Sequence, residues 1–208
     1  MKIRKTIENE YTWNQVKEIL AAGKAREEFG LGGEFTVIVE GIGEVVMQIL
    51  DFDKERVAIP NKNHNMTVMF RDLVLEERPF DKDSKNVWRT SSLRAELNSP
   101  DFVNRFEEGF RKLIVPVLKN NTDGVDTEDV FFLASRDELK DEKKRYEFFG
   151  TERDCVKVNK DGETEWHWTR SPSRGYSCIV WFVGSAGSVG NGRASGSLRC
   201  APLVVLSA

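Results

Sequence analysis

Thiols are the first groups to consider for chemistry, and this chain has three, Cys155, Cys178 and Cys200. An odd and small number of cysteines does not make a disulfide framework. A reactive cysteine needs a nearby positive group to stabilise its thiolate, and the one cation directly beside any of the three is Arg199. The cysteine spacing therefore predicts no catalytic thiol.

The other candidate groups are two histidines, a charged run and a Gly-Ile-Gly triplet. His64 and His167 lie among polar residues, outside any metal-ligand or nucleophile motif, so we expect both on the surface. Acidic residues in 137–147 alternate with Lys and Arg, which is typical of a solvated helix face with local ion pairs. The triplet at 41–43 is too short for a phosphate-binding fingerprint and predicts a turn. We therefore predict no catalytic residue, no metal site, no cofactor and no enzymatic activity.

The composition limits the class of protein. The 208 residues are 39% hydrophobic and 31% charged, with a formal net charge of −3, as in a globular chain that buries a core. The net charge does not favour nucleic-acid binding. No apolar run approaches the roughly 20 residues of a membrane span, and the charged N-terminus has no signal-like apolar region. We expect neither membrane insertion nor a signal peptide.

The C-terminal segment, residues 169–208, differs in composition from the rest. Four arginines are its only charged residues, and it contains no Lys, Glu, Gln or Met. Gly and Ser fill 14 of its 40 positions, which is typical of a flexible linker. Tyr176, Trp181 and Phe182 and an apolar end at 203–206 favour a folded segment instead.

Periodicity predicts the elements that precede this segment. Residues 12–29 are expected to form a helix, followed by strands at 34–40 and 44–51 and a short third strand at 56–59. This helix-plus-β part, residues 1–60, is the first predicted unit. Further along, Ser91 or Ser92 starts a helix, and one apolar stripe predicts a second helix. The residues of that stripe are Phe102, Phe106, Phe110 and Leu113.

Residues 181–190 show a period of two with unequal faces. Neighbouring side chains of a strand point to opposite sides. One side holds Trp181, Val183 and Val189, which suit a core. The other side shares neither size nor polarity and consists of Phe182, Gly184, Ala186, Ser188 and Gly190. The alternative is a poor edge strand with small outward residues.

A family resemblance rests on several sequence blocks. In the C-terminal segment and just before it they are Trp168-Thr169-Arg170-Ser171-Pro172, Val180-Trp181, Val183, Gly187, Val189, Ala194-Ser195 and 197–202. Upstream they are Trp88, 91–98 and 129–135, with weaker matches at 12–13, 32–35 and 41–43. These blocks resemble the target proteins of diversity-generating retroelements. The resemblance implies an α+β, C-type lectin-like fold with small antiparallel sheets and flanking helices over 61–208, with a diversified region at 169–202.

In such systems a reverse transcriptase misincorporates at template adenines, so that asparagine codons come to encode many residue types. With a third-place pyrimidine they do not yield Lys, Glu, Gln, Met or Trp. The C-terminal segment contains no Lys, Glu, Gln or Met, and its one tryptophan, Trp181, is a framework residue outside the implied variable positions. The resemblance implies the following ligand-binding variable positions: Arg174, Gly175, Tyr176, Cys178, Ile179, Phe182, Gly184, Ala186, Ser188, Gly190, Asn191, Gly192, Arg193 and Gly196.

The fixed residues of this segment have a predicted role too. Trp181, Val183 and Val189 are expected in the core. Arg170 and Arg199 are expected to pair with carboxylates from earlier in the chain, because the C-terminal segment contains none. We expect aromatic and arginine side chains among the variable residues to anchor a ligand.

The implied function is a receptor-recognition module that binds a variable protein or cell-surface ligand. Other virion or envelope subunits are further expected partners, with a phage tail or a host cell surface as the location. The alternative is a structural phage or element-encoded domain of the same fold without a diversified site. Calcium-dependent sugar binding lacks oxygen ligands, since the C-terminal segment offers only Asn191. An oxidase of the formylglycine-generating type would need two of the cysteines as a pair.

Overall fold

The largest sheet of the protein joins strands from both halves of the chain. The computed structural model describes residues 11–60, 62 and 64–208. The sheet runs in the order β1 (Glu34–Val39), β2 (Gly43–Phe52), β3 (Asn65–Phe70), β15 (Leu203–Ser207) and β5 (Ile114–Val115), and β8 (Phe131–Phe132) also pairs with β15. Every residue of β3 and β15 is buried. The last strand of the chain is therefore an inner strand and forms part of the core.

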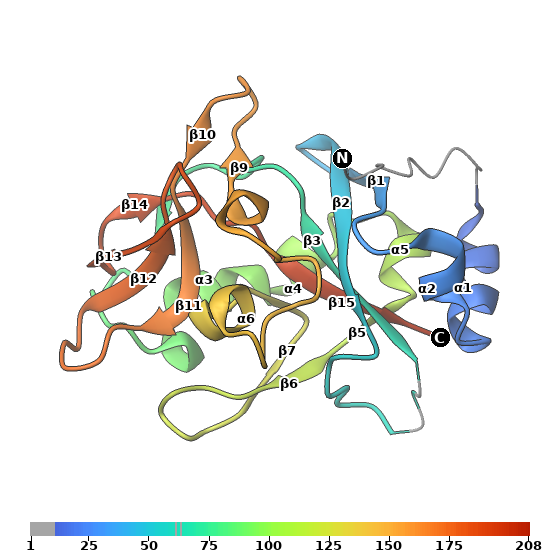
Figure 1. Cartoon of the computed structure of the whole chain (residues 1–208), viewed down its shortest axis with the longest axis horizontal. Coiled ribbons are helices and arrows are strands. Elements are labelled where there is room, and N and C mark those ends of the chain that lie inside the picture. Colours follow the sequence, from blue (N-terminus) through green and yellow to red (C-terminus); the bar gives the residue numbers. More distant parts are fainter. Residues whose placement is uncertain (1–10, 61, 63) are drawn as a thin grey trace.

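Smaller antiparallel units complete a mixed α+β architecture, which confirms the predicted class at that level. A three-stranded sheet consists of β11 (His167–Pro172), β12 (Ile179–Val183) and β13 (Val189–Arg193). Two-stranded pairs are β4 (Arg78–Pro79) with β14 (Ser197–Leu198), β6 (Val117–Lys119) with β7 (Thr127–Asp129), and β9 (Lys157–Val158) with β10 (Thr164–Glu165). Figure 1 shows the three-stranded sheet at the end of the molecule away from the first two helices.

The helix predicted at 12–29 is divided into α1 (Trp13–Ala21) and α2 (Ala25–Phe29). Thr12, where the predicted helix begins, caps α1 through a capping box with Gln15. The division falls at Gly23, whose φ of +67° belongs to the left-handed region and ends a helix. The apolar stripe survives the break, because Val16, Leu20 and Phe29 are all buried.

The second predicted aromatic helix is also interrupted. It forms two single turns, α4 (Pro100–Val103) and α5 (Glu108–Arg111), after α3 (Ser92–Leu97). Phe106 lies between them and stacks on Phe131 with ring centroids 4.8 Å apart. The apolar periodicity therefore predicted correctly that these aromatic residues are buried together, but its prediction of one continuous helix was wrong.

The remaining elements are short. They are the 3-10 turns η1 (Trp88–Thr90) and η2 (Glu152–Cys155) and the helix α6 (Arg136–Lys140). The strand expected at 56–59 is not formed, and Val57 makes only a single bridge to Val117. β2 pairs with β3 across the boundary predicted at residue 60, so residues on both sides share a core. Among the described residues, no helix is long and apolar enough to cross a bilayer.

Candidate ligand-binding surface

The fourteen predicted variable residues lie on one ribbon, which consists of the 173–178 loop, β12, the 184–188 turn, β13 and the 194–196 turn. We call these fourteen residues the variable face. Each of them is at least partly exposed, and Tyr176 is 66% exposed. Val180, Val183 and Ala194, which lie in the same ribbon and are not among the predicted variable residues, are fully buried. Exposed and buried positions are therefore interleaved along one stretch of chain.

The strand predicted across 181–190 is broken by a turn. The Gly184 amide donates to the Ser188 carbonyl at 2.8 Å, and the Gly187 amide donates to Gly184 at 2.9 Å. Gly187 has a φ of +85°, and a Cβ there would lie 1.9 Å from the Glu152 carbonyl oxygen. Strict alternation of two faces was therefore wrong for this stretch, and the turn requires glycine at 187.

The residues of β12 and β13 that were expected in the core differ in burial. Val183 is buried as predicted, together with Val180. Trp181 and Val189 are only partly buried, which corrects their assignment to the core. The guanidinium of Arg136 lies over the Trp181 ring, 4.6 Å from its centroid. Trp181 therefore belongs to the wall of a surface groove.

The ring of Phe182 lies against two other predicted variable positions, Gly190 and Gly192. It also stacks on Trp166 with centroids 4.9 Å apart and planes 9° apart. A Cβ at Gly190, its partner on β13, would lie 2.7 Å from that ring, and one at Gly192 would lie 3.3 Å away. The phenyl ring thus fills the space that the two glycines leave open.

The ribbon is held mainly through its main chain. The Asn86 side-chain amide donates to the carbonyls of Tyr176, at 2.5 Å, and Ile179, at 3.0 Å, and the Asn86 backbone amide donates to Ser177 at 2.9 Å. Lys140 Nζ donates to the Gly187 carbonyl at 2.9 Å. These contacts do not depend on which side chains the variable positions carry. Sequence analysis missed Asn86, since no local pattern distinguishes it from other polar loop residues.

The two fixed arginines pair with acids from earlier in the chain, as predicted. Arg170 Nη2 contacts Glu138 Oε1 at 2.6 Å, and Arg199 Nε pairs with Glu165. Arg199 also donates to the Leu75 carbonyl at 2.8 Å. Both contacts tie the C-terminal segment to the body of the protein.

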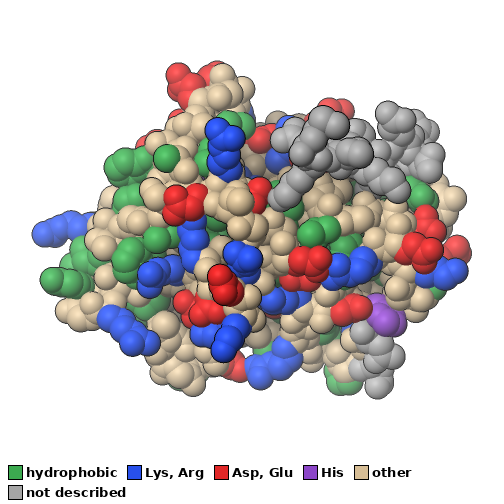
Figure 2. All heavy atoms as spheres, in the orientation of Figure 1, with side chains coloured by type: hydrophobic (Ala, Val, Ile, Leu, Met, Phe, Trp, Pro, Cys, Tyr) green, Lys and Arg blue, Asp and Glu red, His purple; other side chains and the backbone are tan. Residues whose placement is uncertain are grey.

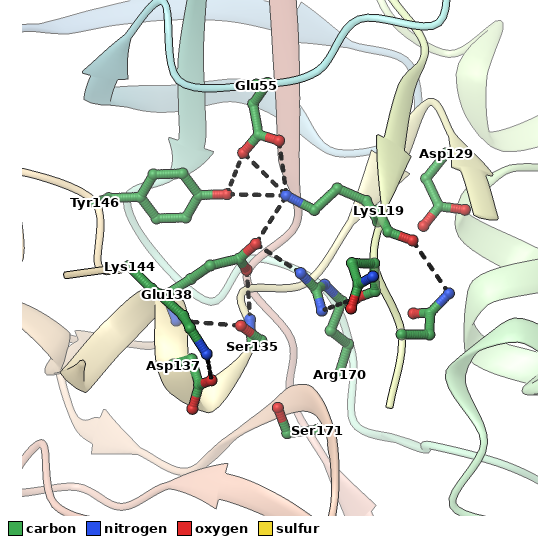
Figure 3. A network of polar contacts seen from close by, with 12 residues as sticks. Glu55, Lys119, Asp129, Ser135, Asp137, Glu138, Lys144, Tyr146, Arg170 and Ser171 are labelled. Carbon is green, nitrogen blue, oxygen red and sulfur yellow. Dashed lines mark hydrogen bonds and ion pairs between the residues drawn. The ribbon is translucent and has the colours of Figure 1, made fainter. Parts of the chain in front are cut away.

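Arg170 and Glu138 belong to a larger polar network that also contains Lys119, Glu55 and Tyr146 (Figure 3). Lys119 Nζ lies 2.8 Å from both Glu55 Oε2 and Glu138 Oε1, and the Tyr146 hydroxyl donates to Glu55 at 2.5 Å. Burial tends to raise the pKa of Glu138, but Arg170 and Lys119 lower it to about 2. The prediction of a solvated face for 137–147 is therefore wrong for Glu138 and Tyr146, which face inward.

A groove of about 900 Å³ opens above this network. It is lined by the 120–123 loop, the N-terminal part of α6, the end of β11 and the ring of Trp181. Arg174, a predicted variable residue, stands at its rim. The groove and the variable face are therefore continuous, which no sequence pattern indicated.

His167 is buried, and its expected surface position was wrong. Burial and the nearby ammonium of Lys157 lower the pKa of His167 to about 3, so its imidazole is neutral near pH 7. His64 is partly exposed, and its Nδ1 lies 3.3 Å from Asp53. Within the described chain, no group of three or more His, Cys, Asp or Glu side chains is placed to hold a metal ion.

The thiols are free. Cys155 and Cys200 are buried, and burial raises the pKa of both, that of Cys200 to about 12. Cys178 is partly exposed on the variable face. A thiol with a raised pKa is a poor nucleophile, so neither buried cysteine has the activated state that thiol chemistry needs.

Comparison with known proteins gives one match. The model of the family described as "Domain of unknown function (DUF6273)" matches residues 64–207, and the chain belongs to that family. The matched region begins just before β3 and includes the 120–123 loop, α6, β11 and the whole ribbon. No curated protein and no solved structure matches the chain.

Proposed function

We propose that this protein is a receptor-recognition module with a C-type lectin-like fold, whose variable face is diversified by a retroelement to bind protein or cell-surface ligands. The observation that carries the proposal is the way the ribbon is attached. Asn86 and Lys140 hold it by carbonyl oxygens, while all fourteen residues of the variable face reach solvent at least in part. Because these contacts are made by main-chain atoms of the ribbon, exchange of exposed side chains would leave the attachment intact.

Energetics supports the same division of roles. Exposed substitutions usually change the free energy of unfolding by no more than about 0.5 kcal/mol, whereas large-to-small changes in the core cost about 2–5 kcal/mol. The buried Val180, Val183 and Ala194 lie at positions that the proposal leaves fixed. Diversification confined to the variable face would therefore leave most variants folded.

The ligand contacts would come from a few anchors. Tyr176 and the exposed Arg174 and Arg193 are the large side chains that project most freely from the variable face. Aromatic and arginine residues supply most of the binding energy in protein interfaces. The glycines of the face would shape the surface around them. No enzymatic step, cofactor or metal is part of the proposal.

Sequencing the DNA next to the gene tests the proposal. We expect a reverse-transcriptase gene and an imperfect repeat of the 169–202 coding region, with adenines at the codons of the variable face. At the codons of Val180, Val183 and Gly187 the repeat should have no adenines that would change the encoded residue. A locus without the repeat, or a repeat with adenines at the buried positions instead, overturns the proposal in favour of a structural domain.

A further inference from the structure

The groove beside the variable face has a charge opposite to that of the whole protein. The chain carries a net charge of −3, yet the groove lining contains seven Lys and Arg residues against four Asp and Glu. Figure 2 shows Lys and Arg side chains gathered on the part of this face where α6 and β11 lie in Figure 1. The excess positive charge is therefore local to the groove.

The acids of the lining are already engaged. Glu55 and Glu138 neutralise Lys119 and Arg170 in the floor. On the rim, Asp137 pairs with Lys144 at 2.7 Å.

Asp123, the fourth acid, pairs with Arg89 at 3.0 Å. Three rim cations, Arg136, Lys143 and Arg174, have no carboxylate within 4 Å in the part of the chain that the structure describes. All three are exposed. The rim therefore offers uncompensated positive charge to a ligand.

From this arrangement we infer that the groove is a docking site for an acidic peptide segment of a partner protein. Arg136 and Arg174 provide planar guanidinium groups, which bind carboxylates through two parallel hydrogen bonds, and Lys143 adds a third cation. Clusters of this kind recognise acidic motifs in proteins. The rim residues Asn120 and Ser173 carry amide and hydroxyl groups that can bond to a peptide main chain.

Other polyanions fit the groove less well. Sequence-tolerant binding of single-stranded nucleic acid relies on open aromatic faces for base stacking. Here one face of Trp181 is covered by the Arg136 guanidinium, and Trp88 is buried with its indole N–H bonded to Asp129 at 2.8 Å. A peptide with carboxylate side chains needs no free ring.

This inference goes beyond the proposed function. Except for Arg174, the rim and floor consist of residues outside the variable face. The groove would act as a constant docking point even if no residue of the ribbon were diversified.

Fluorescence anisotropy of a labelled oligoglutamate peptide with the full chain tests the inference. We expect saturable binding at low salt that weakens as salt is added. Replacing two rim cations, Arg136→Ala with Lys143→Ala, should raise Kd by about tenfold or more. The matched control, Lys17→Ala with Lys160→Ala, removes the same charge from exposed residues outside the groove and should leave Kd unchanged.

Two further arms make the result decisive. Lys143→Ala alone should weaken binding severalfold without altering the thermal midpoint, because Lys143 is exposed and outside the Arg136–Trp181 contact. An oligothymidine strand and heparin should bind more weakly than the peptide. Equal losses in the control variant, tighter binding of either polyanion, or no peptide binding at low salt would each overturn the inference.

Discussion

The ring of Phe182 covers Gly190 on the neighbouring strand, so closely that a Cβ at position 190 would lie 2.7 Å from two of its atoms. The same ring stacks on Trp166, with centroids 4.9 Å apart. Two positions of the variable face are therefore coupled, since the size of one side chain limits the size of the other.

This contact predicts a non-additive pair of substitutions. Gly190→Ala should lower the free energy of unfolding by about 1–2 kcal/mol, because Phe182 must leave its contact with Trp166. In a Phe182→Ala background the same change should be neutral or slightly stabilising, since alanine restricts the unfolded chain more than glycine does. Chemical denaturation of the four proteins gives the coupling energy.

Gly184→Ala is the matched control for this cycle. It lies in the same hairpin, and a Cβ there would meet its nearest neighbour at an ordinary 3.5 Å. It should show no coupling to Phe182. Additive effects for the Phe182 and Gly190 pair would contradict the proposed contact.

Gly175 and Gly187 have the same backbone conformation but different surroundings, so substituting each one distinguishes backbone strain from a steric clash. Gly175 and Gly187 have φ values of +84° and +85°, but only at Gly187 would a Cβ meet the Glu152 carbonyl, at 1.9 Å. Gly175→Ala should cost about 1–2 kcal/mol of left-handed strain. Gly187→Ala should cost clearly more or prevent folding. Similar thermal midpoints for the two variants would argue against a fixed backbone contact under the turn.

Glu138 should make the protein sensitive to acid. Its pKa is about 2 in the folded protein and near 4.5 when unfolded, so its contribution is complete above about pH 5 and is lost as the pH falls towards 2. The full effect is on the order of 3 kcal/mol. Measured by urea denaturation, the free energy of unfolding of Glu138→Gln should fall less steeply between pH 7 and pH 2 than that of the wild-type protein. The exposed control, Glu142→Gln, should follow the wild-type curve. If the free energy of unfolding of Glu138→Gln fell as steeply as that of the wild-type protein, Glu138 would not be the source of the acid sensitivity.

Thiol labelling distinguishes the three cysteines. Cys178 is partly exposed, whereas Cys155 and Cys200 are buried and their pKa values are raised. Native protein treated with iodoacetamide should be alkylated at Cys178, and the other two should react only after unfolding. Mass spectrometry locates the label, and Cys178→Ser should remove native labelling. Rapid native alkylation of Cys155 or Cys200 would revive the thiol-chemistry interpretation.

Local sequence signals predicted local structure well. Thr12 and Ser91 cap the helices that were predicted to begin there, because their side chains accept hydrogen bonds from amides within the next turn. The charge imbalance of the C-terminal segment also predicted that Arg170 and Arg199 need acids from elsewhere, and both have them.

Long-range arrangements were not accessible in the same way. Lys119, Glu55 and Tyr146 meet through segments far apart in the chain, and nothing in the flanking residues of any one of them indicates the others. Residues 137–147 looked solvated for this reason, and Glu138 was missed. The turn at 184–188 was overlooked because small residues fit a strand face and a turn equally well in a periodicity argument.

The position of β15 has a consequence for synthesis of the chain. This strand follows the ribbon in sequence, yet it lies between β3 on one side and β5 and β8 on the other. A ribosome that stops early or shifts frame within the ribbon would release a product whose central sheet has a missing strand and whose apolar surfaces stay open to water. A stop codon or frameshift in that region would therefore prevent folding, whereas an in-frame substitution on the variable face would not, because only polypeptides translated in frame through Ser207 can complete the interior.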